Sequence, residues 1–191
     1  MAQWIDHRAF AWLSRVLLAA VVAGLSWACA MASWADAVAS AAIAAVIAAI
    51  LFGWPRLPSL LAFLLAVAAT VNGAGYAFKL WHDETLFDEV VHAFTSFAGM
   101  AAIGWALLER QPQAGSHARL IANVIGIGFA LGILWECFEW LIGIIGRPRD
   151  TAIDLLMDGA GILAAAVLVA RLARADRPDH DAVGNRSELA E

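Results

Sequence analysis

Six apolar stretches divide this chain, and each is long enough to cross the hydrocarbon core of a membrane. That core is about 30 Å thick and takes roughly 20 helical residues to span. Backbone polar groups find no water inside a bilayer, so helices are the expected form of these segments. We therefore predict an all-α, polytopic membrane bundle of about six transmembrane helices. The stretches cover approximately residues 10–35, 37–54, 60–78, 90–108, 120–145 and 153–170.

The composition agrees with this class of protein. Of the residues, 62% are hydrophobic and only 15% are charged, and the mean hydropathy of +0.74 lies outside the range of soluble domains. No polar domain separates the apolar stretches, which predicts a single transmembrane domain over residues 1–174. Residues 175–191 are polar and lack an apolar face, so we predict a disordered cytoplasmic tail. Cys29 and Cys137 fall inside apolar stretches, where we expect buried thiols rather than a disulfide framework.

The basic residues predict how the bundle is oriented. Cytoplasmic loops of membrane proteins carry an excess of lysine and arginine. If the amino terminus is cytoplasmic, nine of the twelve basic residues lie inside, and only Lys79, Arg147 and Arg149 lie outside. Both termini are therefore predicted to be cytoplasmic, with membrane lipids as the expected partners. No basic surface indicates nucleic acid, and the sequence leaves open whether the chain forms a homo-oligomer.

Six ionisable side chains interrupt the last three apolar stretches, where each charge costs several kcal/mol. Spacings of three or four residues place the members of each set on one face of a helix. With the predicted topology and a helical rise of about 1.5 Å per residue, the three faces meet within roughly 14 Å of the outer helix ends. We therefore expect one outward-facing polar pocket. Its members are Asp88, His92, Glu136, Glu139, Asp154 and Asp158.

So many carboxylates cannot all be ionised at close range without strong repulsion. Three ways of reducing this repulsion remain open: protonation of some of the carboxylates, pairing with Arg147 or Arg149, or binding of a divalent cation. An imidazole and several carboxylates on facing helices suit Mn, Fe, Zn or Mg, and helical bundles build metal sites from such inward-pointing residues. Of these three, binding of a cation neutralises the most charge. We predict as its ligands His92, Glu136, Glu139 and Asp154.

The remaining polar residues are assigned supporting roles. Asp158 or Asp88 is expected to act as a catalytic base or to orient a metal ligand. At the rim of the pocket we expect a substrate-binding set, in which the two arginines suit a phosphate group. This rim consists of Arg147, Arg149 and Asp150.

Several of these residues also have a purely structural interpretation. Residues 151–154 fit a capping box at the start of the sixth helix, where Asp150 also suits an N-cap. Asp88 suits the same role in the fourth helix. Asp158 and Glu136 fit this interpretation least, because both lie too deep for capping and have no basic residue nearby in sequence.

The order of these motifs resembles that of a known family. Three motifs follow one another along the chain: Asp88-x-x-x-His92, Glu136-Cys-Phe-Glu139-Trp140 and Asp150-Thr-x-x-Asp154. In these motifs and their order the chain resembles the YjdF-like family of small, functionally uncharacterised bacterial inner-membrane proteins. The same order is similar to the VanZ-like family, whose pattern runs Asp-Lys-x-x-His, Glu-x-x-Gln, Arg-x-x-Ser-x-x-Asp and Asn-x-x-Gly. Against that pattern, Glu139 replaces Gln and Asp158 replaces Asn, and both replacements make the pocket more acidic. The resemblance implies a multi-pass protein of the bacterial inner membrane.

The leading hypothesis for function is a metal-dependent membrane enzyme acting on a lipid or lipid-linked headgroup, because the carboxylates lie near headgroup depth. VanZ-like proteins are associated with resistance to a teicoplanin-type antibiotic, which acts outside the membrane. The chain has no Gly-x-Ser-x-Gly motif, so hydrolysis would need a metal-activated water. Two alternatives stay open: a cation or proton-coupled transporter, and a structural or regulatory membrane protein whose polar residues lock helix packing.

Overall fold

The computed structural model describes residues 8–31, 33–53, 56–82, 86–110, 117–144 and 147–175. These residues form six α-helices and one short 3-10 helix, and they contain no β-strand. The predicted all-α fold is confirmed, whereas the predicted tail lies outside the described residues from residue 176 onward. The elements are α1 (Arg8–Met31), α2 (Trp34–Gly53), α3 (Ser59–Phe78), η2 (Leu80–His82), α4 (Phe87–Arg110), α5 (His117–Ile142) and α6 (Pro148–Ala175).

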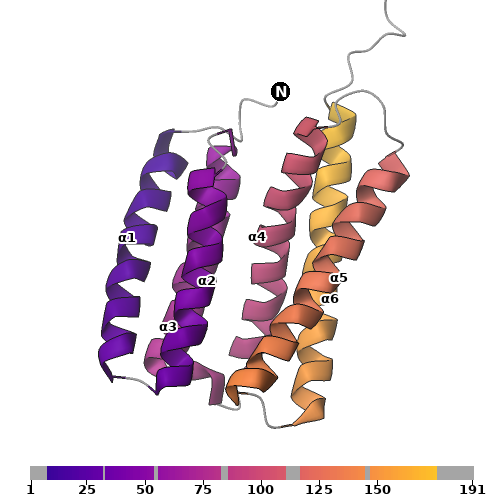
Figure 1. Cartoon of the computed structure of the whole chain (residues 1–191). Helices are drawn as coiled ribbons and strands as arrows, with labels where there is room; N and C mark the ends of the chain where they lie inside the picture. Colours follow the sequence, from indigo (N-terminus) through magenta and orange to yellow (C-terminus); the bar gives the residue numbers. More distant parts are fainter. Residues whose placement is uncertain are drawn as a thin grey trace, which may run out of the picture.

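The helices alternate in direction and form two halves of three helices each (Figure 1). Helix α3 packs against α1 and α2 in one half, and α6 packs against α4 and α5 in the other. Contact between α3 and α4 joins the halves. The start of α1 and the end of α6 lie at the same end of the bundle, here named the terminal end, and the α5–α6 connection lies at the opposite, distal end (Figure 1). This placement agrees with termini on one side of a membrane.

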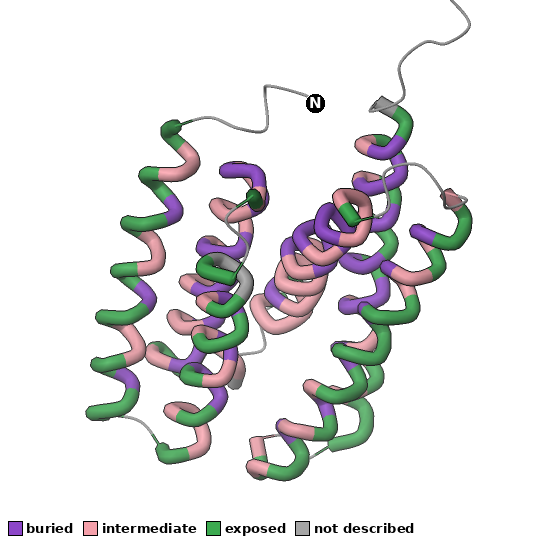
Figure 2. The backbone as a smooth tube through the Cα atoms, turned by 45° about the horizontal axis from the view of Figure 1, so that its top comes forward, coloured by how far each residue is buried: buried purple, intermediate pink, exposed green. Residues whose placement is uncertain are grey.

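Apolar side chains cover much of the outside of the bundle. Trp27, Leu141 and Leu156 are 62% to 84% exposed, and exposed residues run along α1 and α5 in Figure 2. Soluble proteins rarely expose contiguous apolar surface of this kind, whereas a bilayer favours it. The prediction of buried thiols was wrong, because Cys29 and Cys137 are both exposed on this outer surface.

Five of the helices, all except α2, are long and apolar enough to cross a membrane by length and composition. Helix α2 is apolar over the shorter stretch Trp34–Ala49. The first helix ends at Met31, earlier than predicted, because Ser33 caps the next helix. The Ser33 hydroxyl donates to the Asp36 carboxylate at 2.8 Å and accepts from the Asp36 amide at 3.3 Å. Ser33 is thus the N-cap residue of α2, and the hydrogen bond to its hydroxyl from the Asp36 amide fixes the start of the helix.

The connection between α5 and α6 also differs from the predicted helix bounds. Helix α5 ends at Ile142, because Gly143 adopts a left-handed conformation with φ of 78°. The Ile144 amide then donates to the Glu139 carbonyl at 3.0 Å, as in the C-terminal motif that glycine favours. Helix α6 begins earlier than predicted, at Pro148, a residue suited to the first helical position because it has no amide hydrogen to leave unpaired.

Helix α6 approaches α4 closely at Gly161. A methyl group on Gly161 would overlap the carbonyl oxygen of Ala93 and would lie 2.9 Å from the backbone nitrogen of Phe97. Small residues of this kind let transmembrane helices approach backbone to backbone. Because Ala93 directly follows His92, this contact sets His92 beside α6.

An apolar cluster, here named the terminal core, fills the terminal half of α4, α5 and α6. It includes Trp105, Val124 and Val169, of which Val124 and Val169 are fully buried. Its buried members along these helices are apolar side chains. The buried polar residues of the same helices lie toward the distal end, and they are Glu136, Glu139, Asp154 and Asp158.

Candidate metal centre

The predicted polar pocket lies at the distal end of α4, α5 and α6. At about 1.5 Å per residue, His92 lies ~7.5 Å from the start of α4, and Glu136 lies ~9 Å from the end of α5. Asp154 lies ~9 Å from the start of α6 by the same rise. The revised helix ends place Glu136 nearer the distal end than predicted. The three helices therefore bring these side chains to one level.

His92 contacts a carboxylate on each side. Its Nδ1 atom lies 3.3 Å from Asp158 Oδ1, and its Nε2 atom lies 3.5 Å from Asp88 Oδ1. Asp158 Oδ1 also accepts a 2.6 Å hydrogen bond from the Ser96 hydroxyl. Asp158 is only 4% exposed. The imidazole is thus held between α4 and α6, with both ring nitrogens near carboxylate oxygens.

Two sets of three side chains place potential ligand atoms within 4.8 Å of one another, and both sets include His92. Their members all belong to α4, α5 and α6. Asp88, predicted to act as a base or orienting group, belongs to one set. Asp158 belongs to neither and contacts the His92 ring instead. The sets are Asp88, His92 and Asp154, and His92, Glu136 and Glu139.

Among the described carboxylates of this cluster, Glu136 alone has both oxygens fully buried and without a hydrogen-bond partner. It is 3% exposed, and neither carboxylate oxygen has a partner among the described residues. The Thr151 hydroxyl lies near enough to influence Glu136 but outside hydrogen-bond geometry, and it accepts a hydrogen bond from Trp140 Nε1 at 2.9 Å. A buried carboxylate without a partner is unfavourable in free energy. Glu136 is therefore the member of the cluster whose burial the described protein groups explain least.

Helix α3 supplies polar groups to the opposite wall of the site. The Tyr76 hydroxyl donates to Glu139 Oε1 at 3.3 Å, and Asn72 Nδ2 donates to the Thr95 hydroxyl oxygen at 2.7 Å. Trp81 packs against Tyr76 with ring centroids 5.2 Å apart. These contacts tie α3 to α4 and α5 beside the acidic cluster.

The predicted rim residues lie at the distal end but outside the cluster. Arg147 is 80% exposed in its side chain, and its Nε atom donates to Asp150 Oδ2 at 3.0 Å rather than to a carboxylate of the cluster. Arg149 is exposed. The capping-box interpretation of residues 151–154 was wrong, because α6 already begins at Pro148 and these residues lie inside the helix.

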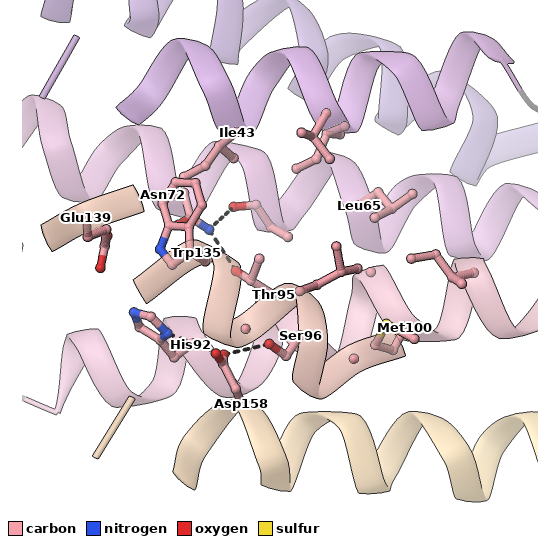
Figure 3. A pocket seen from close by; sticks show the side chains of 18 of the residues that line it. Ile43, Leu65, Asn72, His92, Thr95, Ser96, Met100, Trp135, Glu139 and Asp158 are labelled. Carbon is pink, nitrogen blue, oxygen red and sulfur yellow. Dashed lines mark hydrogen bonds and ion pairs between the residues drawn. The ribbon is translucent and has the colours of Figure 1, made fainter. Parts of the chain in front are cut away.

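A cavity of about 250 Å³ adjoins the cluster and extends from it toward the middle of the bundle. Residues of α2, α3, α4 and α5 line it together with Trp81 of η2 and Asp158 of α6, and most of the lining residues are apolar. In Figure 3, His92 and Glu139 lie toward one end of the cavity, and Leu65 and Met100 lie toward the other. Asp158 lies between them with its hydrogen bond to Ser96.

A family model described as predicted membrane protein (DUF2238) matches residues 10–175, which is nearly the whole bundle. The chain belongs to the DUF2238 family. The predicted resemblance to YjdF-like proteins is confirmed by this match, because they form the same family, while the VanZ-like resemblance stays a prediction. Neither the comparison with curated proteins nor that with solved structures gave a match.

Two polar contacts of this DUF2238 protein were not predicted, the one from Ser96 to Asp158 and the one from Tyr76 to Glu139. Ser96 follows His92 by four residues and therefore lies on the same face of α4, so the spacing contained the signal. The Tyr76 contact depends on how α3 is aligned against α5, which helical spacing within one segment does not determine.

Proposed function

We propose that the acidic cluster binds a divalent metal ion and acts on a lipid or lipid-linked headgroup at the outer face of a bacterial inner membrane. The proposed ligands are the members of the two three-residue sets, which share the His92 imidazole. They are His92, Glu136, Glu139, Asp154 and Asp88.

The Glu136 carboxylate carries this proposal. Its two oxygens are buried without a partner, and one of them lies within 4.8 Å of potential ligand atoms of Glu139 and His92. Removing a charge from water is unfavourable unless a nearby opposite charge compensates. A divalent ion at this point would satisfy both oxygens and would relieve the repulsion between the carboxylates.

The contacts of His92 favour a single ion. Because Nδ1 faces Asp158, Nε2 is the nitrogen available to a metal, and a carboxylate partner on the other nitrogen is the usual way to orient a ligating imidazole. Two ligand atoms of one ion lie at most ~4.2 Å apart when each bond is ~2.1 Å long. Within each set the potential ligand atoms lie within 4.8 Å of one another, which is close to this spacing.

A divalent ion held by these residues would supply an acidic water for hydrolysis of an ester bond of the headgroup, in which the hydroxyl of the water would go to one side of the broken bond and its proton to the leaving alcohol. The Asp88 side chain is 34% exposed, so it can reach both the ion and water and is the candidate base. Asp158 is more deeply buried and would position His92. Arg147 and Arg149, exposed at the same end, would bind a phosphate of the substrate.

The terminal core favours a one-sided site over the transporter alternative. An ion crossing the bundle would need polar groups between the cluster and the terminal end. The buried positions of the terminal core are occupied by apolar side chains such as Trp105 and Val169. The polar cluster therefore has access from the distal end and not through this part of the described bundle.

Elemental analysis of the purified protein tests metal binding. The protein is purified in mild detergent without chelator or nickel resin, beside Glu136→Gln and His92→Ala, and each sample is reconstituted with Mn, Fe, Zn or Mg. Glu89→Gln is the control, because Glu89 lies on α4 outside both ligand sets. We expect near-stoichiometric metal in the wild type and the control and its loss in both variants. Wild-type protein that holds no metal after reconstitution would overturn the proposal.

Release of water-soluble headgroups from phospholipids and lipid-linked phosphates, measured on metal-loaded protein, tests the reaction. Turnover by the wild type that disappears in Glu136→Gln supports the enzyme assignment. A Glu136→Gln variant that keeps both metal and turnover would remove Glu136 from the site.

A further inference from the structure

The lining of the cavity beside the acidic cluster changes from polar to apolar along its length. Its distal half contains polar groups, and the part toward the terminal end is lined by apolar residues such as Leu65 and Met100 (Figure 3). The polar lining residues are His92, Glu139, Asp158, Ser96, Thr95, Asn72 and Tyr76. A polar molecule would leave its hydrogen-bonding groups unpaired in the apolar part, which is unfavourable by several kcal/mol in general. The lining therefore fits a molecule with one polar end and one hydrocarbon end.

The cavity reaches the outer surface of the bundle between α2 and α5. Both helices line it, yet they make little or no contact with each other in the described residues. Val46 of α2 lines the cavity and is 60% exposed, and Leu131 of α5 lines it and is 47% exposed. Both side chains lie in the middle of apolar helices, where the surroundings are the hydrocarbon of the membrane. The opening is thus lateral and faces acyl chains.

We propose that this cavity binds one hydrocarbon chain of a membrane lipid, which enters between α2 and α5 and brings the attached headgroup to the acidic cluster. This inference rests on the proposed function and names the hydrocarbon-chain part of its substrate. The volume of about 250 Å³ lies just below the range of about 300 to 1,000 Å³ that is usual for whole-ligand pockets. A single chain segment fits this volume, while the rest of the lipid stays in the bilayer.

Gly99 provides a variant that fills the cavity without disturbing the surrounding protein. Gly99 lines the cavity on α4, and a Cβ atom at this position would meet no other atom within 4 Å. A larger side chain there would extend into the space assigned to the hydrocarbon chain. Leucine is suitable because it favours helices and carries no polar group. Gly126→Leu is the matched control, since Gly126 also has open space around its Cβ position but lies on α5 outside the cavity lining.

The experiment uses a phospholipid with a photoactivatable diazirine in the middle of one acyl chain, in vesicles of phosphatidylethanolamine and phosphatidylglycerol. After irradiation, mass spectrometry locates the labelled residues on the full chain. We expect labelling of the cavity residues Met100 and Ile103 in the wild type and in Gly126→Leu. In Gly99→Leu this labelling should fall about tenfold, as expected when a bound chain loses most of its contact. Labelling of the outward-facing Leu156 and Leu163 serves as the internal reference and should not change.

Two results would overturn the inference. One is labelling confined to outward-facing residues such as Leu156, and the other is equal cavity labelling in Gly99→Leu and Gly126→Leu. The Glu136→Gln variant separates the test of hydrocarbon-chain binding from the test of metal binding in the proposed function. It should lose the metal and retain labelling of Met100, so failure of metal binding and failure of chain binding give different results.

Discussion

His92 of α4 and Asp158 of α6 form the central contact of the acidic cluster, with Nδ1 of the imidazole 3.3 Å from Oδ1 of the carboxylate. Ser96 fixes the same carboxylate oxygen from one turn further along α4. A carboxylate behind a histidine sets which ring nitrogen is available and how the ring is oriented. This contact therefore holds the His92 ring in one orientation, as the proposed metal site requires.

We expect Asp158→Asn to weaken metal binding by about 10- to 100-fold, the usual effect of removing an orienting partner of a ligand. The reason is that a neutral amide replaces the charged Asp158 carboxylate beside His92 Nδ1 and therefore holds the imidazole ring less firmly. Competition titration with a metal-sensitive dye measures the change. Asp36→Asn, at a half-buried position on α2 outside both ligand sets, should bind metal as the wild type does. Equal affinities for Asp158→Asn and the wild type would show that the contact has no orienting role.

Metal should stabilise the wild type and leave Glu136→Gln almost unchanged. An ion at 100 times its dissociation constant adds about 2.7 kcal/mol to the free energy of unfolding of a protein that binds it only when folded. Without metal we expect the opposite order, with Glu136→Gln at least as stable as the wild type, because a neutral amide is less unfavourable to bury without a partner than a charge. Thermal unfolding in detergent, with and without metal, measures both. Equal stabilisation of the two proteins by metal would contradict this prediction.

The sequence predicted the membrane class and the convergence of three helices, because helical spacing and alternating direction determine which residues share a face and a depth. His92, Glu136 and Asp154 follow this rule and lie at one level. Helix ends were predicted less well, because local capping decides them. Ser33 starts α2 and Gly143 ends α5, and a hydropathy pattern contains neither effect.

The contacts between helices were beyond prediction from one sequence. Spacing indicates that Glu139 points inward, but only the alignment of α3 against α5 brings Tyr76 to it. The cavity depends in the same way on how the two halves meet. Its lining residues come from five α-helices and the short η2, and no motif in any one of them indicates an empty space.

Gly161→Ala should separate α4 from α6 and reduce stability. The added methyl group meets backbone atoms of Ala93 and Phe97, which cannot move as a side chain can. Overpacking of this kind costs about 1 to 3 kcal/mol. Thermal unfolding in detergent should show this loss, together with weaker metal binding, because Ala93 adjoins His92. Gly126→Ala meets open space and serves as the control, and a loss of similar size in both variants would argue against the close contact.

The predicted orientation can be tested with single cysteines in a Cys29→Ser, Cys137→Ser background. Arg147→Cys lies at the distal end and Arg110→Cys at the terminal end, and both positions are exposed. We expect a membrane-impermeant maleimide to label Arg147→Cys in intact bacterial cells and Arg110→Cys only after permeabilisation. The reverse pattern would place the acidic cluster on the cytoplasmic side.

All members of both ligand sets come from α4, α5 and α6, whereas α2 and α3 supply only walls of the cavity. Substitutions at Ile47 or Leu65 therefore alter the shape offered to a hydrocarbon chain without moving a ligand atom. Within this one bundle, the part of the cavity wall that α2 and α3 supply can vary separately from the half that would carry the chemistry. Relatives with the same acidic cluster are thus free to differ in the lipids they select.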